Sequence, residues 1–342
     1  MSHGNALTQK ARYRAHCTGT GHQDSVRHLK SGPPQHPVPH ADRDQARLEA
    51  AVFERLDGTI DYCAHPAGVA QVHPEPGHLT VALDPEFASG HSLPEHTLGI
   101  LLPTQYTGPE ESEGPGGIIG VRLRGIDTAG LHLGYAGTDA HVTLTGPTPQ
   151  QWHTILDNQL RACRDHHLTP LWDAPDLTPA ETAHTAADTT WHDERADSAW
   201  IASGLLRRIG LLHTVTTPYS ARYWPHGLGW KFELRYEHGA PVDHDALLEH
   251  LVHPKWGIPL EMTRDSCACK TCDCDRGAER NCSYTLTPQG DHGEVVIHFR
   301  RDRAGRDVSD EYGRLVAAGA GAEWLQQALP SHHHRLTPAS AA

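Results

Sequence analysis

The stretch that decides the fold is residues 118–145, IIGVRLRGIDTAGLHLGYAGTDAHVTLT. Within it, apolar and polar residues alternate in three short runs, which is the period of a strand with one buried face. Turn-forming residues at 127–130 and 137–140 separate the runs. The stretch therefore predicts three antiparallel strands connected as a meander.

A helix is expected directly after this meander. Thr148 suits the N-cap, Pro149 suits the first turn, and Gln151 can complete a capping box with Thr148. The apolar stripe recurs at helical spacing, at Trp152, Ile155, Leu156, Leu160 and Cys163. A sheet followed by one amphipathic helix indicates an α+β layer.

The second half of the chain repeats this order of elements. Before the meander, a helix over 42–56 precedes strands over 78–83 and 97–102. In the second half we expect helices over 200–209, after Asp243 and after Ser309, and strands over 211–217, 221–223, 230–236, 259–263, 284–287 and 294–300. The predicted fold class is α+β, with two sheet-plus-helix modules that could be a duplication. A cysteine-rich metal knuckle lies in the second module, and a short helical arm precedes the first.

The domain organisation follows from shifts in composition. We expect a basic helical arm (1–31), a proline-rich linker (32–41), an α+β module (42–172), an acidic linker (173–199), an α+β module with the knuckle (200–330) and a disordered tail (331–342).

Composition limits the class of protein. With 37% hydrophobic residues the chain can bury a core, so wholesale disorder is excluded. The residue usage is typical of a high-GC bacterial genome, and the 29 histidines fit this bias. No apolar segment is long enough for a secretory signal or a membrane span, which predicts a cytoplasmic protein without a membrane partner.

The N-terminal arm is locally basic although the formal net charge of the chain is −13. It has one acidic residue, Asp24, against five basic residues, Lys10, Arg12, Arg14, Arg27 and Lys30. The arm could be a helix–turn–helix that contacts nucleic-acid phosphates, or a helical hairpin that docks on the body. A nucleic-acid or protein partner through this arm is therefore expected.

Five cysteines lie close together, at Cys267, Cys269, Cys272, Cys274 and Cys282. The spacing of Cys269 and Cys272 is the usual bidentate spacing for tetrahedral zinc, and four thiolates close a structural site. Because the run interrupts two predicted strands, it predicts a structural zinc knuckle at the end of a hairpin. The fifth thiol leaves open which four bind.

Other ligands and other metals fit the same run. His292 or His298 could replace a thiolate, although strand alternation points His298 away from the face of Val295, Ile297 and Phe299. An iron–sulfur cluster, Cu(I), disulfides or unliganded thiols are the alternatives to zinc.

Familiar catalytic patterns do not fit. His73-Pro-Glu75 and His292-Gly-Glu294 stand in the wrong order or too far from Cys269 for a zinc deaminase. Residues 114–120 precede a strand and miss the dinucleotide-binding pattern, and neither a P-loop nor a nucleophile elbow occurs.

An aromatic group in the second half reads mainly as sheet core. It consists of Tyr219, Tyr223, Trp224, Trp230 and Tyr236. Because Arg222 and Lys231 are interleaved with it, the same group could stack nucleic-acid bases.

Together these features predict a binding or adaptor protein with a structural zinc knuckle. One alternative is an enzyme with a histidine-lined pocket between the modules, with or without a metal. Another is a metal-responsive or metal-storage protein that uses all five thiols.

The zinc prediction can be tested directly. Replacing Cys269 and Cys272 with serine is expected to remove about one zinc per chain and to lower the melting temperature by about 5 °C or more. Elemental analysis and thermal unfolding measure both effects. The control is the pair Lys270→Ser and Thr271→Ser, which should change neither quantity. Purified protein without stoichiometric zinc or iron would contradict the prediction.

Overall fold

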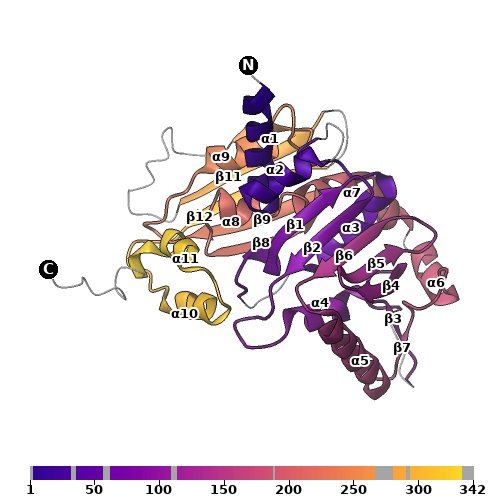
Figure 1. Cartoon of the computed structure of the whole chain (residues 1–342). Helices are drawn as coiled ribbons and strands as arrows, with labels where there is room; N and C mark the ends of the chain where they lie inside the picture. Colours follow the sequence, from indigo (N-terminus) through magenta and orange to yellow (C-terminus); the bar gives the residue numbers. More distant parts are fainter. Residues whose placement is uncertain are drawn as a thin grey trace.

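The computed structural model describes residues 3–31, 36–56, 62–108, 114–187, 189–265, 280–289 and 293–332. It contains two five-stranded sheets with helices packed on them (Figure 1). The predicted α+β class with two modules is therefore confirmed.

The first module contains four helices and seven strands in the described residues. They are α3 (Arg43–Leu56), β1 (Val69–Glu75), β2 (His78–Leu83), α4 (Leu93–Leu101), β3 (Thr104–Tyr106), β4 (Val121–Asp127), β5 (Gly130–Tyr135), β6 (His141–Thr145), α5 (Pro149–Asp165), β7 (Leu168–Pro170) and α6 (Pro179–Ala187), with the 3-10 turn η1 (Pro66–Gly68) before β1.

The second module contains α7 (Thr189–Leu206), α8 (Leu211–Thr214), β8 (Ser220–His226), β9 (Gly229–Tyr236), α9 (His244–Leu251), β10 (Leu260–Asp265), β11 (Arg280–Pro288), β12 (Val295–Arg301), α10 (Ser309–Ala317) and α11 (Ala322–Ala328). The N-terminal helices are α1 (His3–Thr18) and α2 (His22–Lys30).

The two large sheets share one topology. Their strand orders are β1-β2-β6-β5-β4 and, from the corresponding edge, β8-β9-β12-β11-β10. Each sheet begins with a hairpin, continues through a helix and ends in a three-stranded meander. The last strand of the meander runs parallel to the second strand of the hairpin, as β6 does to β2 and β12 to β9. The predicted repeat in element order therefore extends to the connectivity of the sheets.

Local signals placed two helices correctly. The Thr148 hydroxyl accepts a hydrogen bond from the Gln151 amide, and the Gln151 side chain accepts one from the Thr148 amide, so the predicted capping box is present. Asp243 caps α9 by accepting from the Ala246 amide at 2.9 Å.

Three expectations were wrong. Residues 97–102, predicted as a strand, belong to α4, which Ser92 caps. Residues 211–217 contain the short helix α8. Both segments are short and have no clear period, so strand and helix cannot be told apart from the sequence pattern. The single helix after Ser309 is two helices, because Gly319 takes a left-handed φ of 83° and ends the first.

Residues 173–199, expected to connect the modules, contain α6 and the first part of α7. One continuous core then spans both modules. At its centre the Phe53 ring of α3 stacks on Tyr223 of β8, with centroids 4.2 Å apart, and lies against Trp230. Tyr223, Trp230 and Tyr236 are buried, as predicted, whereas Trp224 lies on the opposite face of the sheet.

A buried ion pair joins the modules where α3 and α7 lie side by side (Figure 1). Arg207, directly after α7, donates from Nε and Nη2 to the two carboxylate oxygens of Glu49 at 2.7 and 2.6 Å. Ser203 and Gln45 also donate to this carboxylate, and the remaining guanidinium nitrogen donates to the Pro39 carbonyl. Both charges are at most 1% exposed, so each depends on these partners.

The N-terminal helix packs on the body. Tyr13, Arg14 and Cys17 of α1 are buried, and the Tyr13 hydroxyl donates to the carbonyls of His250 and Trp256. Arg14 donates to the Pro37 carbonyl at 2.7 Å. Arg14 is therefore not part of an exposed basic surface, although Arg12, Arg27 and Lys30 are exposed.

Within the described residues, none of the helices combines the length and apolar character that a membrane span requires.

The Glu49–Arg207 pair gives a stability prediction. Arg207→Met leaves the Glu49 carboxylate buried without its counter-charge, so the free energy of unfolding should fall by about 3–5 kcal/mol in urea titrations. Arg27→Met breaks the exposed Arg27–Asp24 pair and should cost less than about 1 kcal/mol. Similar losses in the two variants would contradict the assignment.

Candidate functional site

The predicted metal ligands divide between described and undescribed parts of the chain. Cys267, Cys269, Cys272 and Cys274, together with His292, lie outside the described residues. The strands that the cysteine run connects, β10 and β11, are antiparallel neighbours, with Asp265 paired to Tyr284. The run therefore does join two strands of a hairpin, as the sequence predicted.

Cys282 and His298 are both described, and they lie on opposite faces of the second sheet. Cys282 is 3% exposed and pairs across the strands with the buried Phe299. His298 is half-buried and lies on the face opposite to Val295, Ile297 and Phe299, as predicted. One ion therefore cannot take Cys282 and His298 together as direct ligands.

A cleft of about 480 Å³ lies between the modules. Its walls come from α3, α6, α7, the loop before β4 and the β8–β9 turn. The side chains that matter chemically are Arg47, Glu54, Arg55, Tyr135, His184 and Trp230. A pocket between the modules was an alternative prediction, but His184 is the one histidine among its described lining residues.

Small side chains leave this space open. α3 contributes Ala50 and Ala51 to the wall, and α7 contributes Ala199 and Ala202. Side chains of core size at these positions would fill the cleft, because protein interiors pack closely wherever their side chains allow it. The cleft is therefore built into the sequences of the two helices that meet there.

The charge of the cleft centres on Arg47. The Nε atom of Arg47 is buried and has no hydrogen-bond partner within the described chain. The Nη1 atom lies 3.8 Å from the carboxylate of Asp44, which is a long ion-pair distance. Arg55 donates one hydrogen bond to the Gly117 carbonyl at 2.8 Å. Burial raises the pKa of Tyr135, with Arg47 acting in the opposite direction, so the phenol stays protonated and can donate.

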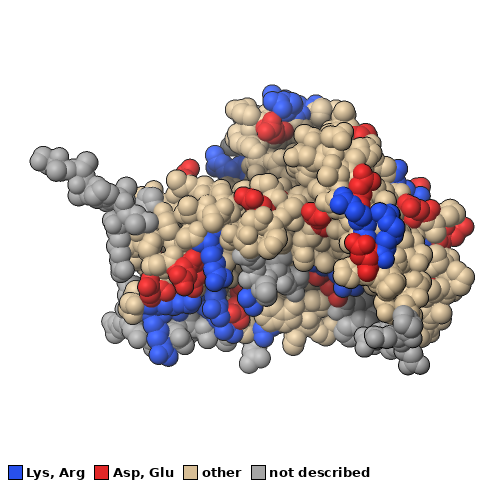
Figure 2. All heavy atoms as spheres, turned by 90° about the horizontal axis from the view of Figure 1, so that it is seen from below, with Lys and Arg blue, Asp and Glu red and all other residues tan. Residues whose placement is uncertain are grey.

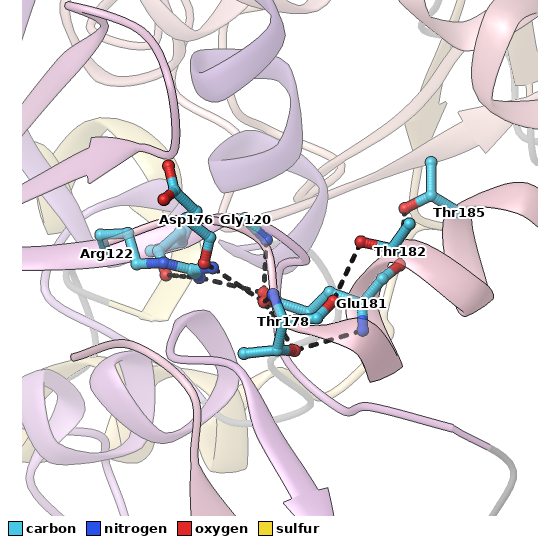
Figure 3. Close-up of polar contacts among 8 residues, drawn as sticks. Gly120, Arg122, Asp176, Thr178, Glu181, Thr182 and Thr185 are labelled. Atoms are coloured by element: carbon cyan, nitrogen blue, oxygen red, sulfur yellow. Dashed lines mark hydrogen bonds and ion pairs between the residues drawn. The ribbon is translucent and has the colours of Figure 1, made fainter. Parts of the chain in front are cut away.

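A second buried ion pair fixes the wall that α6 forms (Figure 3). Arg122 of β4 donates to both oxygens of Glu181 on α6, at 2.9 and 2.8 Å. The same carboxylate accepts from the amides of Gly120 and Thr178. The Thr178 hydroxyl in turn accepts a hydrogen bond from the Glu181 amide at the start of the helix. His184 of the cleft lies one turn further along α6.

These contacts decide the charge state of Glu181. Burial alone would raise its pKa, but the hydrogen bonds from Arg122, Thr178 and Gly120 outweigh burial and lower the pKa to about 2. The carboxylate is therefore ionised at neutral pH and remains paired with Arg122.

A carboxylate–imidazole pair occupies a different pocket. Asp84, 2% exposed, accepts from the His65 amide and from its Nδ1, both at 2.7 Å. Nearby, Ala67 has a left-handed φ of 62°. The adjoining pocket is about 60 Å³, room for only a few atoms. Both hydrogen bonds tie the loop before β1 to Asp84, so the pair has a structural role.

Three histidines form a row on the half-exposed face of the first sheet. The rings of His78 and His132 lie 4.8 and 5.1 Å from that of His141, and all three are linked through Thr143 or to one another by hydrogen bonds. Burial and the neighbouring histidines lower the pKa of His141 to about 4. Over the described ranges, no three side chains of His, Cys, Asp or Glu are arranged to hold a metal ion.

The face seen from below in Figure 2 carries acidic and basic side chains in small mixed groups, with wide uncharged areas between them. The chain matches no protein-family model, no curated protein and no solved structure. A function can therefore be inferred only from the geometry of the chain itself.

No sequence pattern singles out the residues of the cleft or the ion pair beside it. Arg47 and Arg55 read as the solvated face of an amphipathic helix, and Glu181 read as part of an acidic linker. A buried charge is recognised only when its distant partner is known, and here Arg122 is 59 residues away.

The Glu181 pair predicts an acid-dependent stability. Because its pKa is lowered in the folded state, the pair stabilises the fold above about pH 4.5 and loses this effect as the pH falls toward 2. Glu181→Gln should lower the free energy of unfolding by about 3 kcal/mol at pH 7 and by clearly less near about pH 3. Urea unfolding at the two pH values measures the difference.

The matched control is Asp176→Asn. Arg122 contacts the backbone carbonyl of Asp176 and not its carboxylate, so this variant should unfold like the parent. A deficit in Glu181→Gln that is the same at both pH values would contradict the assignment.

Proposed function

We propose that this protein binds a small anionic ligand in the cleft between its modules. The observation that carries the proposal is Arg47, which lines the cleft with a side chain that is 37% exposed and has only a long carboxylate contact in the described structure, 3.8 Å from Nη1 to Asp44. A guanidinium without a close counter-ion can pair with a ligand anion through its accessible nitrogens. The cleft volume of about 480 Å³ falls within the range of small-molecule sites.

The lining favours one class of ligand. The guanidinium of Arg47 suits a carboxylate, phosphate or sulfonate, which it can contact through two nitrogens. The Tyr135 hydroxyl can add a neutral donor, and the alanines of α3 and α7 together with Trp230 offer apolar surface. A ligand with one anionic group on an apolar or planar body matches this combination.

We also propose that the cysteine run holds structural zinc in a cytoplasmic protein, where thiolates stay reduced. Support comes from the hairpin that it joins. Cys267 follows Asp265 by two residues and Cys282 precedes Tyr284 by two, and those two residues are a cross-strand pair. Chain geometry keeps the Cα atoms of Cys267 and Cys282 within about 7 Å of Asp265 and Tyr284 respectively, so these two cysteines are attached to neighbouring points of the hairpin.

The cleft proposal is tested with 1-anilinonaphthalene-8-sulfonate, an anionic aromatic probe. We expect saturable binding near one probe per chain, measured by fluorescence titration. Arg47→Gln should weaken it about tenfold or more, since hydrogen bonds to a charged group contribute about 1.5–3 kcal/mol. Ala50→Trp, which fills the cleft, should abolish it.

The control is Arg43→Gln, on the same helix, whose contact with Asp197 is an exposed one at 3.8 Å. It should bind the probe like the parent protein. Thermal unfolding of each variant shows whether the fold is intact. Unchanged probe binding in folded Arg47→Gln and folded Ala50→Trp would contradict the proposal.

A further inference from the structure

The face of the second sheet that points away from the core, called the outer face below, carries several basic side chains, although the formal net charge of the chain is −13. Along β9 the residues Trp230, Phe232, Leu234 and Tyr236 are buried, so Lys231, Glu233 and Arg235 project from the opposite face. The same alternation places Arg222 and Trp224 of β8, and His298 and Arg300 of β12, on this outer face.

The strand registers arrange these side chains in three rows. Trp224 pairs with Lys231, which pairs with Val296. In the next row Arg222 pairs with Glu233, which pairs with His298, and in the third row Arg235 pairs with Arg300. Directly opposed residues in neighbouring strands lie about 5 Å apart, so the rows form one continuous surface.

The Glu233 carboxylate lies among the cations of this face. Glu233 pairs with Arg235 at 3.1 Å and with Arg300 at 2.9 Å, while both arginine side chains remain 40% exposed. Arg222 is exposed, and Lys231 lies over the ring of Trp224 at 5.6 Å. Four cations therefore surround one carboxylate, with Glu261 and Glu294 at the margins of the face.

Aromatic rings accompany these cations along the edge strand β8. Tyr62 lines a small pocket together with Arg222, and the exposed Arg314 stacks over the Tyr62 ring at 5.8 Å. Arg222 therefore shares a pocket with Tyr62 and lies two residues before Trp224 on the same face of β8. Burial together with Lys231 and Arg300 lowers the pKa of His298, as expected where the local field is positive.

We infer that this face binds single-stranded nucleic acid, with phosphates on Arg222, Lys231, Arg235 and Arg300 and a base stacked on Trp224. Charge complementarity selects a polyanion, and the aromatic rings beside the cations favour one that also offers flat bases. An acidic peptide would use the charges but not the rings. The inference is independent of the cleft proposal, because none of these residues lines the cleft.

The test is fluorescence anisotropy of a labelled oligothymidylate of about 20 nucleotides with the full-length protein, at about 50 and 200 mM salt. Binding should weaken as salt rises. Arg222→Gln with Lys231→Gln should reduce the affinity about tenfold at the lower salt and flatten the salt dependence by about 1.4 logarithmic units per decade. Trp224→Leu should reduce the affinity about fivefold or more while leaving the salt dependence unchanged.

The matched control removes two exposed positive charges elsewhere, through Arg161→Gln with Arg164→Gln on α5 of the first module. It should bind like the parent, and thermal unfolding confirms that all variants are folded. Absence of oligonucleotide binding at low salt, or equal losses in the two double variants, would overturn the inference. Polyglutamate that competes equally well with the parent and with Trp224→Leu would instead identify an acidic peptide surface.

Discussion

Where α3 of the first module meets the end of α7 of the second, the Glu49 carboxylate and the Arg207 guanidinium are buried together and fully hydrogen-bonded. Neither charge can be left alone in that environment, so the two helices must meet at this register. The stacking of Phe53 on Tyr223 and the continuous core beside it follow from this contact. The relative position of the modules is therefore set by a polar requirement as much as by apolar packing.

The cleft is a consequence of the same junction. The ion pair holds α3 and α7 together, and both helices contribute alanines to the wall of the cleft. The Arg122–Glu181 pair fixes α6, which forms another part of that wall. Two buried ion pairs thus bound a space that Arg47 and Arg55 line together with Glu54. The outer face of the second sheet shows the opposite arrangement, with Glu233 partly neutralising arginines that remain exposed.

What the sequence could predict was local. The meander, the Thr148 capping box and the Asp243 cap depend on residues a few positions apart, and the structure contains all three. Residues 97–102 of the α4 region were mistaken for a strand because so short a segment has no clear period. Glu49–Arg207 and Arg122–Glu181 look like ordinary surface charges until the fold joins them. The cleft, which depends on both, therefore could not be derived from the chain alone.

The shared topology gives the cysteine run a different meaning. The connection that corresponds to it in the first module, between β4 and β5, passes directly from Asp127 to Gly130 through two residues, whereas in the second module it spans 266–279. Hairpin connections tolerate such lengthening at a small entropic cost. The first module completes a sheet of the same strand order with a connection of two residues, so this sheet topology does not itself require the run.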